Sequence, residues 1–350
     1  MEPEKIPVPV AAPAPAHMGE PLPEEPEPEP GPVKSLFHGA KWVLAALGSV
    51  LLFFVLMALG QLVAYRVVSF ASASRVASTA QVSALSGSAS VDELVSAAQI
   101  EDAADATDSA FAMSVMSFLG EFTALAGIAL LWRRMAGRSF ISRRAIGKRD
   151  PGEVALLVVG AALFGLGVQL GLNAIMSLVF TALPALGEAY REHITSVTGG
   201  ADANLLNFLS SAVGAPFAEE TLLRGVVLEC LLRAFSPTWR RGRELPVPRS
   251  GAVVVAVVLQ GLIFGVIHMN LVQSTYATVL GALFGYVCWR TGRLRYSILL
   301  HLAVNSLSYL PSEALGFLAE VPAASVLFLV AGLALFLRAS KRREGDALPV

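Results

Sequence analysis

The chain has 350 residues, of which 55% are hydrophobic and only 15% are charged, and its net charge is −1. A soluble domain would carry about a quarter charged residues, so this composition argues against a soluble protein. The even charge balance also gives no sign of a nucleic-acid partner. Apolar runs as long as the 40 residues from Ser250 to Trp289 predict a chain that crosses a membrane several times.

The amino-terminal segment differs in composition from the rest of the chain. Residues 1–33 hold eleven of the twenty prolines and seven glutamates. Such a segment cannot bury enough apolar surface to offset the entropy of ordering it. We therefore predict a disordered, Pro/Glu-rich cytoplasmic tail over residues 1–40, and a short basic cytoplasmic tail over residues 339–350.

Eight apolar segments lie between these tails. A helix needs about 20 apolar residues to cross the hydrocarbon of a bilayer. The fold class predicted is all-α, a polytopic membrane helical bundle of about eight transmembrane helices. We expect three spans in an amino-terminal part, residues 41–203, and a core of further spans in residues 204–338. The expected spans are residues 42–66, 110–132, 153–183, 204–234, 251–269, 273–289, 296–310 and 321–337.

Positive charge predicts the orientation of these spans. With both termini inside, the cytoplasmic segments carry 21 of the 26 Lys and Arg residues, and the outside segments and span edges carry only Arg66, Arg75 and Arg191. This asymmetry is the one that the positive-inside rule requires. We expect an integral protein of a bacterial cytoplasmic membrane with both termini cytoplasmic. Residues 69–109, rich in Ala and Ser, are expected to form an extracytoplasmic linker.

Two spans carry carboxylates near mid-depth. Glu121 in the second span has no basic residue at i+4, and we interpret it as a polar contact to a neighbouring helix. The fourth span holds Glu219, Glu220 and Arg224, and each charge at a helix centre costs roughly 2.5–3.5 kcal/mol. Glu220 and Arg224 are spaced i and i+4, which predicts a buried ion pair. Glu219 points about 100° away from Glu220 and lacks an intrahelical partner.

Other polar residues share the same i and i+4 spacing. Glu229 and Arg233 lie nearer the cytoplasmic end of the fourth span, where we expect a solvated pair. Two later spans each carry a pair on one helix face: Phe264 with His268, and His301 with Asn305. A carboxylate in a low-dielectric pocket can act as a general base toward water, and imidazole and amide N–H groups can stabilise an oxyanion. These groups predict a polar intramembrane cavity suited to the attack of water on a carbonyl.

In this order on three membrane helices, the motifs Glu-Glu-x-x-x-Arg, Phe-x-x-x-His and His-x-x-x-Asn resemble those of the CPBP superfamily. This superfamily comprises the CAAX proteases and the bacteriocin-processing, Abi-type membrane proteases. The resemblance covers about residues 205–310 and implies an eight-helix intramembrane endopeptidase. It implies seven site residues: Glu219 activating water with His268 assisting, His301 and Asn305 forming the oxyanion site, and Glu220, Arg224 and Phe264 supporting the geometry.

The resemblance also implies a substrate class. We expect hydrolysis of a peptide bond in a membrane-associated or lipidated peptide or protein, with membrane lipid as the surrounding partner and no cofactor. The prenyl specificity of the eukaryotic CAAX proteases does not transfer with the motifs, because many bacterial members have no assigned substrate.

Three alternatives stay open. A zinc-dependent intramembrane metalloprotease would use His268, His301 and a glutamate, although the chain has no His-Glu-x-x-His and Asn305 is a poor zinc ligand. An ion transporter would use the embedded glutamates, and it would predict an internal repeat, of which the sequence shows none. A non-catalytic membrane scaffold or immunity-type protein would use the polar residues as contacts between helices.

The depths of the two histidines do not match. At 1.5 Å per residue, His268 lies roughly 25 Å along its span from the cytoplasmic start, whereas His301 lies only about 9 Å into its own. The two can meet if the fifth helix begins later than residue 251 or is strongly tilted. Pro216, three residues before Glu219, is expected to bend the fourth helix.

Overall fold

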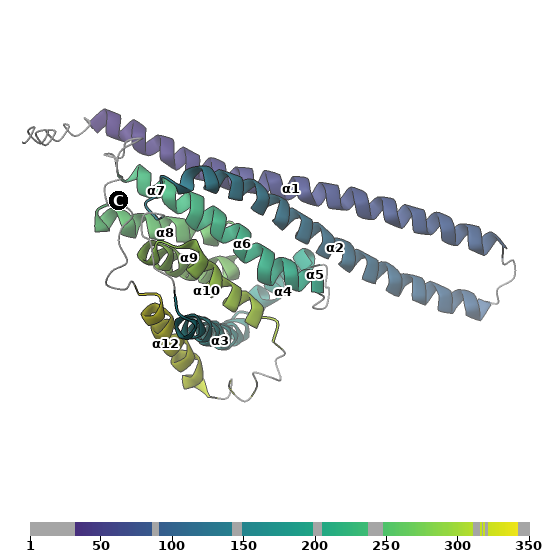
Figure 1. Cartoon of the computed structure of the whole chain (residues 1–350). Coiled ribbons are helices and arrows are strands. Elements are labelled where there is room, and N and C mark those ends of the chain that lie inside the picture. Colours follow the sequence, from purple (N-terminus) through teal and green to yellow (C-terminus); the bar gives the residue numbers. More distant parts are fainter. Residues whose placement is uncertain are drawn as a thin grey trace, which may run out of the picture.

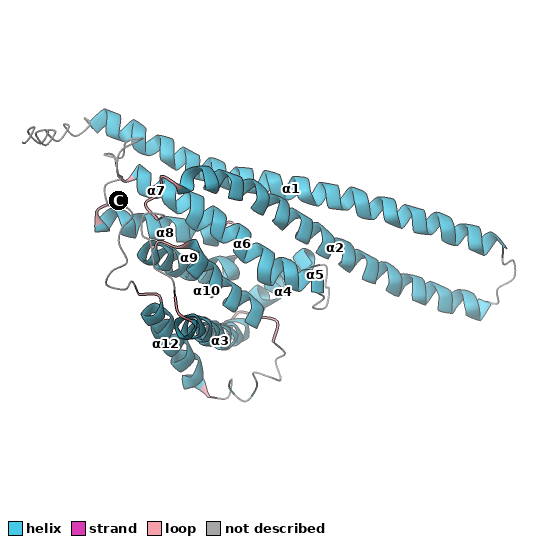
Figure 2. Ribbon diagram, viewed as in Figure 1, coloured by secondary structure: helices cyan, strands magenta, loops and turns pink. Residues whose placement is uncertain are grey.

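The computed structural model describes residues 32–85, 91–141, 149–198, 205–236, 248–310, 316, 318 and 321–341. All the regular secondary structure in this part of the chain is helical (Figure 2). Four of its helices contain stretches long and apolar enough to cross a membrane: Ser35–Ala71, Phe111–Ala136, Pro151–Ala182 and Leu271–Thr291. The chain is therefore a polytopic helical membrane protein, and the all-α prediction is confirmed.

Helices occupy all eight ranges that the sequence marks as spans. Ser250–Val266 and Ala323–Ala339 are apolar but shorter than the four long segments. One helix, α4 (Pro184–Thr198), lies outside the predicted ranges. The helices in the predicted ranges are α1 (Pro32–Leu85), α2 (Val91–Ala136), α3 (Pro151–Ala182), the segment from α5 to α7, α8 (Ser250–Val266), α9 (Leu271–Thr291), α10 (Leu294–Leu307) and α12 (Pro322–Ala339).

Helices α1 and α2 form a long antiparallel pair that extends beyond the other helices (Figure 1). With 54 and 46 residues, they measure about 80 and 70 Å, far more than the roughly 30 Å of bilayer hydrocarbon. Residues 69–85 and 91–109 of the expected extracytoplasmic segment continue the two helices, and the extracytoplasmic location of this segment stays a prediction. Alanine is the best helix former, and the Ala-rich composition of the segment accounts for these helices.

Glycines allow neighbouring helices to approach closely. A Cβ at Gly60 of α1 would lie 2.6 Å from the carbonyl oxygen of Leu119 in α2, and one at Gly160 of α3 would lie 2.8 Å from the backbone nitrogen of Phe336 in α12. Small residues at such crossings are typical of helices that pack within membranes. They hold α1 against α2 and α3 against α12 around two apolar cores.

The fourth predicted span is one helix that changes register twice. Helix α5 (Leu205–Phe208), the π-helical segment η1 (Leu209–Gly214), α6 (Ala215–Glu220), the π-helical segment η2 (Thr221–Val227) and α7 (Leu228–Ala234) follow without a break. The junction residues Gly214, Ala215, Glu220 and Thr221 all keep right-handed helical dihedrals. Pro216 lies at the start of α6 and is accommodated by the π-helical turns before it.

Candidate active site

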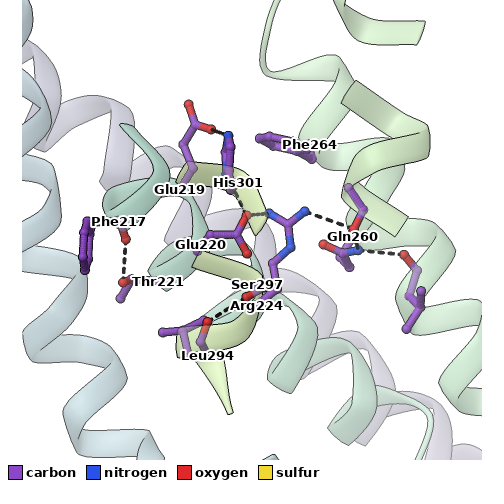
Figure 3. Close-up of polar contacts among 12 residues, drawn as sticks. Phe217, Glu219, Glu220, Thr221, Arg224, Gln260, Phe264, Leu294, Ser297 and His301 are labelled. Atoms are coloured by element: carbon purple, nitrogen blue, oxygen red, sulfur yellow. Dashed lines mark hydrogen bonds and ion pairs between the residues drawn. The ribbon is translucent and has the colours of Figure 1, made fainter. Parts of the chain in front are cut away.

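Glu219 and Glu220 end helix α6 and point in different directions (Figure 3). The side chain of Glu220 is fully buried, whereas 17% of the Glu219 side chain is exposed. Consecutive residues on a helix are separated by about 100°, so one carboxylate faces the packed interior while the next reaches a less enclosed space. The expectation that Glu219 points away from Glu220 is therefore confirmed.

Glu220 is the centre of a buried polar network. Its Oε1 lies 2.8 Å from Nη1 of Arg224, one turn along the helix, which confirms the predicted buried ion pair. The same oxygen accepts a hydrogen bond from Nδ1 of His301 at 2.9 Å. A carboxylate paired with a guanidinium can only accept, so the Nδ1 atom of His301 carries a proton. Nε2 is then the ring atom that faces Glu219, at 3.8 Å from its Oε2.

Arg224 is fully buried and is enclosed by aromatic rings and a backbone carbonyl. Its guanidinium carbon lies 4.7 Å from the ring centre of Phe264 and 5.5 Å from that of Phe284. Its Nη2 donates to the carbonyl oxygen of Gly281 at 3.0 Å. Contacts of a cation with aromatic faces, together with an ion pair, offset part of the cost of burying the charge.

Gln260 belongs to the same network, although the sequence analysis did not single it out. It is completely buried, and its amide nitrogen donates to the carbonyl oxygens of Gly281 at 2.7 Å and Val257 at 2.9 Å. The sequence signal that could have identified it is a glutamine within an apolar helix, one turn before Phe264. Through this hydrogen bond, Gln260 links α8 to the same Gly281 carbonyl oxygen that accepts from Arg224.

Phe264 connects the two histidines. His268 lies in the turn after α8, and its Nδ1 donates to the Phe264 carbonyl oxygen at 2.7 Å. The Phe264 ring makes edge contacts with His268 at 4.8 Å and with His301 at 5.7 Å between ring centres. The sequence offered two ways for His268 and His301 to meet: a later start of the fifth helix, or a strong tilt. The first is wrong, because this helix, α8, begins at Ser250.

Asn305 lies one turn beyond His301 on α10 and donates through Nδ2 to the carbonyl oxygen of Ser211 at 2.9 Å. That carbonyl lacks its helical donors. The backbone N–H of Ala215 bonds to Ser210 instead, and the next residue, Pro216, has no N–H. Asn305 therefore satisfies an acceptor that the π-helical turn and the proline leave open, and it fixes α10 against the fourth helix.

The structure brings most of the predicted site together. Five residues form one connected cluster: Glu219, Glu220, Arg224, Phe264 and His301 (Figure 3). His268 joins this cluster through Phe264, and Asn305 adjoins it along α10.

Glu121 approaches this cluster from α2. The Cβ atom of Glu121 lies 3.5 Å from the position that a Cβ on Gly214 of η1 would take, so α2 packs closely against the fourth helix here. The predicted polar contact to a neighbouring helix stays a prediction. The carboxyl group of Glu121 lies near that of Glu219. Its Oε2 is buried and has no hydrogen-bond partner within the described chain.

The second ion pair of the helix contradicts the sequence interpretation. Glu229 and Arg233, expected to be solvated, are both buried, with Glu229 Oε1 2.6 Å from Arg233 Nε. The other carboxylate oxygen accepts hydrogen bonds from the Ser139 hydroxyl at 2.8 Å and the Phe140 backbone N–H at 3.0 Å. The turn after α2 folds over this end of the helix and excludes water, which the helix sequence alone did not reveal.

Comparison with known proteins identifies the central part of the chain. The family model described as type II CAAX prenyl endopeptidase Rce1-like matches residues 201–307, which contain all three motifs. Residues 201–307 form a Rce1-like domain of this family. The resemblance inferred from the motifs is thereby confirmed, and the Rce1-like domain implies a membrane peptidase. No curated protein and no solved structure matches the chain.

Among the residues that the structure describes, no group of three or more His, Cys, Asp or Glu side chains is arranged to hold a metal ion.

Proposed function

We propose that this protein is an intramembrane endopeptidase in which Glu219 activates a water molecule for attack on a peptide carbonyl. The observation that carries the proposal is the position of His301. Its Nδ1 is held by Glu220, while its Nε2 lies 3.8 Å from Glu219 Oε2. A partly exposed carboxylate and a fixed imidazole on two different helices thus face the same space.

The chemistry requires one proton to move twice. Glu219 removes a proton from water as the water oxygen bonds to the scissile carbonyl carbon, and the carbonyl oxygen becomes an oxyanion. When the C–N bond breaks, Glu219 returns the proton to the leaving amine nitrogen. No covalent intermediate with the protein forms, so the reaction needs no Ser or Cys nucleophile.

The oxyanion is assigned to the α10 side of the site. In its doubly protonated form, the His301 ring donates through Nε2 while Nδ1 remains bonded to Glu220. Asn305 Nδ2 carries two hydrogens, of which one bonds to Ser211 and the other is available to the oxyanion. Donors that are fixed before the reaction stabilise developing charge without reorganising.

Glu220 and Arg224 hold the ring rather than react. Both side chains are fully buried, so neither can contact the substrate. Since Glu220 bonds to Nδ1, it sets the ring orientation and directs Nε2 toward Glu219. His268, held by the Phe264 carbonyl, is assigned to assist the water from the α8 side.

The proposed substrate is a membrane-associated peptide or protein, with or without a lipid anchor. The site lies on helices of a membrane protein, so a substrate must reach it from the bilayer or its interface. We further propose eight membrane spans, a cytoplasmic location for both termini, and an extracytoplasmic location for the distal end of the α1–α2 pair. The distribution of positive charge supports this orientation.

The test compares wild-type protein with Glu219→Gln in membranes and after purification. Glutamine preserves the shape of the side chain but cannot accept the proton, so the cleavage rate should fall by about 10²–10⁴-fold. The readout is the set of membrane proteins and peptides processed in cells, followed by cleavage of an identified peptide in detergent. Thermal stability should stay close to that of the wild type.

Glu192→Gln is the matched control, because Glu192 is an exposed carboxylate on α4. It should cleave at the wild-type rate. Wild-type cleavage by Glu219→Gln would refute the assignment of the base. An arm with exhaustive chelation addresses the zinc alternative: activity lost on chelation and restored by stoichiometric zinc would establish a metalloprotease instead.

A further inference from the structure

A cavity of about 710 Å³ lies outside the candidate active site. It lies between the first turns of α3, the first half of α10 and Phe217 of α6. Figure 3 shows Phe217 on the side of its helix away from His301 and Glu219. The proposed reaction uses none of the residues that line this cavity.

Three arginines gather at the mouth of the cavity. Arg149 lies just before α3, Arg293 just before α10, and Arg295 in the first turn of α10. Glu153 is the nearby carboxylate, with its Oε1 3.4 Å from Nη1 of Arg149. Asp150 is engaged in capping α3, where it accepts the backbone N–H of Glu153. Three arginines thus stand against two carboxylates, Asp150 and Glu153, and the mouth carries a net positive charge.

The guanidinium groups have unused donors. Arg149 is buried, with only 6% of its side chain exposed, and its Nη2 donates to the Lys341 carbonyl oxygen. The Nε atoms of Arg149 and Arg293 are buried and have no hydrogen-bond partner in the described part of the chain. A charged donor that is withdrawn from water without an acceptor is costly. The described chain therefore does not use the full donor capacity of these two guanidinium groups.

The walls of the cavity are apolar. Leu157 and Val158 of α3 face Leu299 and Leu302 of α10, with Phe217 closing the far side. Leu302 lies eight residues after the first residue of α10, which corresponds to a depth of about 12 Å. Both helices begin at the arginine end, so the arginines lie at the membrane interface and the apolar walls extend toward the hydrocarbon.

We propose that this cavity binds an anionic glycerophospholipid. Its phosphate contacts Arg293, Arg295 and Arg149, and an acyl chain lies along Val158 and Leu302. A basic pocket between helices at the membrane interface is the environment that selects anionic headgroups. A free phosphate ion would meet the arginines but would leave the apolar walls without a partner. The positive charge at the mouth and the apolar walls together favour a phospholipid over a free phosphate ion.

Another cavity in the same chain serves as a comparison, because it lacks the basic mouth. This second cavity, of about 610 Å³, lies between α3, α4 and α9 and is lined almost entirely by apolar residues, including Ile175 and Val279. No lysine or arginine lines it. A lipid that enters this second cavity is held by its acyl chain alone, so its headgroup should not matter.

The test measures thermal unfolding of the full chain in a neutral detergent. Phosphatidylglycerol should raise the midpoint by roughly 2–5 °C, as expected for a ligand that binds only the folded state. Phosphatidylcholine with identical acyl chains should not, and neither should sodium phosphate at equal ionic strength. Native mass spectrometry should show retained phosphatidylglycerol. An equal shift with phosphatidylcholine, or the full shift with phosphate alone, would overturn the proposal.

Variants that remove positive charge show where the lipid that raises the unfolding midpoint is bound. Arg293→Gln with Arg295→Gln should abolish most of the shift. Arg133→Gln with Arg134→Gln removes the same charge from the exposed end of α2 and should retain the shift. Equal shifts in the two double variants would contradict the assignment of the headgroup to this cavity.

A volume variant keeps the test informative if the arginine variant fails to fold. Val158→Trp fills the proposed acyl site without changing charge and should also abolish the shift. Val279→Trp fills the apolar cavity instead and should retain it. Retention of the full phosphatidylglycerol shift in Val158→Trp would show that no acyl chain lies in the proposed cavity.

Discussion

Two ion pairs with the same spacing lie on one helix, and they have different surroundings. Glu220 pairs with Arg224 at 2.8 Å, and Glu229 pairs with Arg233 at 2.6 Å. Both acids are completely buried. The first pair also holds His301, which faces the partly exposed carboxylate of Glu219.

The second pair is closed off by the chain itself. Glu229 accepts two hydrogen bonds from the turn after α2, and Arg233 donates to the Arg138 carbonyl oxygen at 2.7 Å. The Arg233 guanidinium also lies over the Trp42 ring of α1, 4.7 Å from its centre. Spacing on the helix therefore does not separate a site from a structural contact. What separates them is that the first network also reaches the partly exposed carboxylate of Glu219, the proposed base, through His301.

Breaking each pair gives the largest expected effect. Glu220→Ala and Glu229→Ala each leave an arginine buried without its partner, which should lower the free energy of unfolding by about 3–5 kcal/mol. The two should differ in activity per folded molecule. Glu220→Ala frees the His301 ring and should lose most cleavage, whereas folded Glu229→Ala should cleave nearly as the wild type does.

The measurement pairs thermal unfolding in detergent with the cleavage rate of the folded fraction. Equal losses of specific activity in both variants would show that the first pair has no separate link to the site. Unchanged stability in Glu229→Ala would contradict the buried geometry of the second pair.

Removing one hydrogen-bond partner from each pair sharpens the comparison. His301→Ala keeps Glu220 and Arg224 together but removes an oxyanion donor, which should cost about 2.7–4 kcal/mol of barrier, or 10²–10³-fold in rate. Ser139→Ala removes a hydrogen bond to Glu229 and should cost about 1.5–3 kcal/mol of stability. Rate should change mainly in the first variant and stability mainly in the second.

The comparison also shows what the sequence could and could not predict. The pair of Glu220 and Arg224 was predictable because charges in mid-span must be paired, whatever surrounds them. The burial of Glu229 was not, because it depends on a turn about 90 positions earlier that folds back onto the helix. The π-helical turns were equally hidden, and with them the reason why Asn305 meets the Ser211 carbonyl.

The positions of the helices were predicted well for a similar reason. Apolar runs report directly on membrane helices, and each expected span coincides with a helix. The helices over residues 69–85 and 91–109 were less evident from the sequence, because composition indicated only that this segment was not apolar. Residues in water and residues in a membrane can both favour a helix, and this helix propensity decided the structure of the segment.

Replacing both members of a pair by leucine separates stability from chemistry. A buried ion pair exchanged for apolar side chains is often neutral or stabilising by 1–4 kcal/mol. Glu220→Leu with Arg224→Leu should therefore recover most of the stability lost in Glu220→Ala, but not the cleavage rate. Glu229→Leu with Arg233→Leu should recover both. Recovery of full activity by the first double variant would mean that His301 needs no carboxylate at Nδ1.

The smallest effect is expected at Glu121, the third carboxylate near the site. Its carboxyl group lies near that of Glu219, and the described chain offers its Oε2 no hydrogen bond that a substitution would break. Glu121→Gln keeps the volume and removes only the ionisable group, so the cleavage rate should change by no more than about threefold, under 1 kcal/mol of barrier. Glu219→Gln, assayed in parallel, should lose at least about 10²-fold. If Glu121→Gln instead abolishes cleavage while Glu219→Gln retains it, the water is activated from α2, and the roles of the two carboxylates must be exchanged.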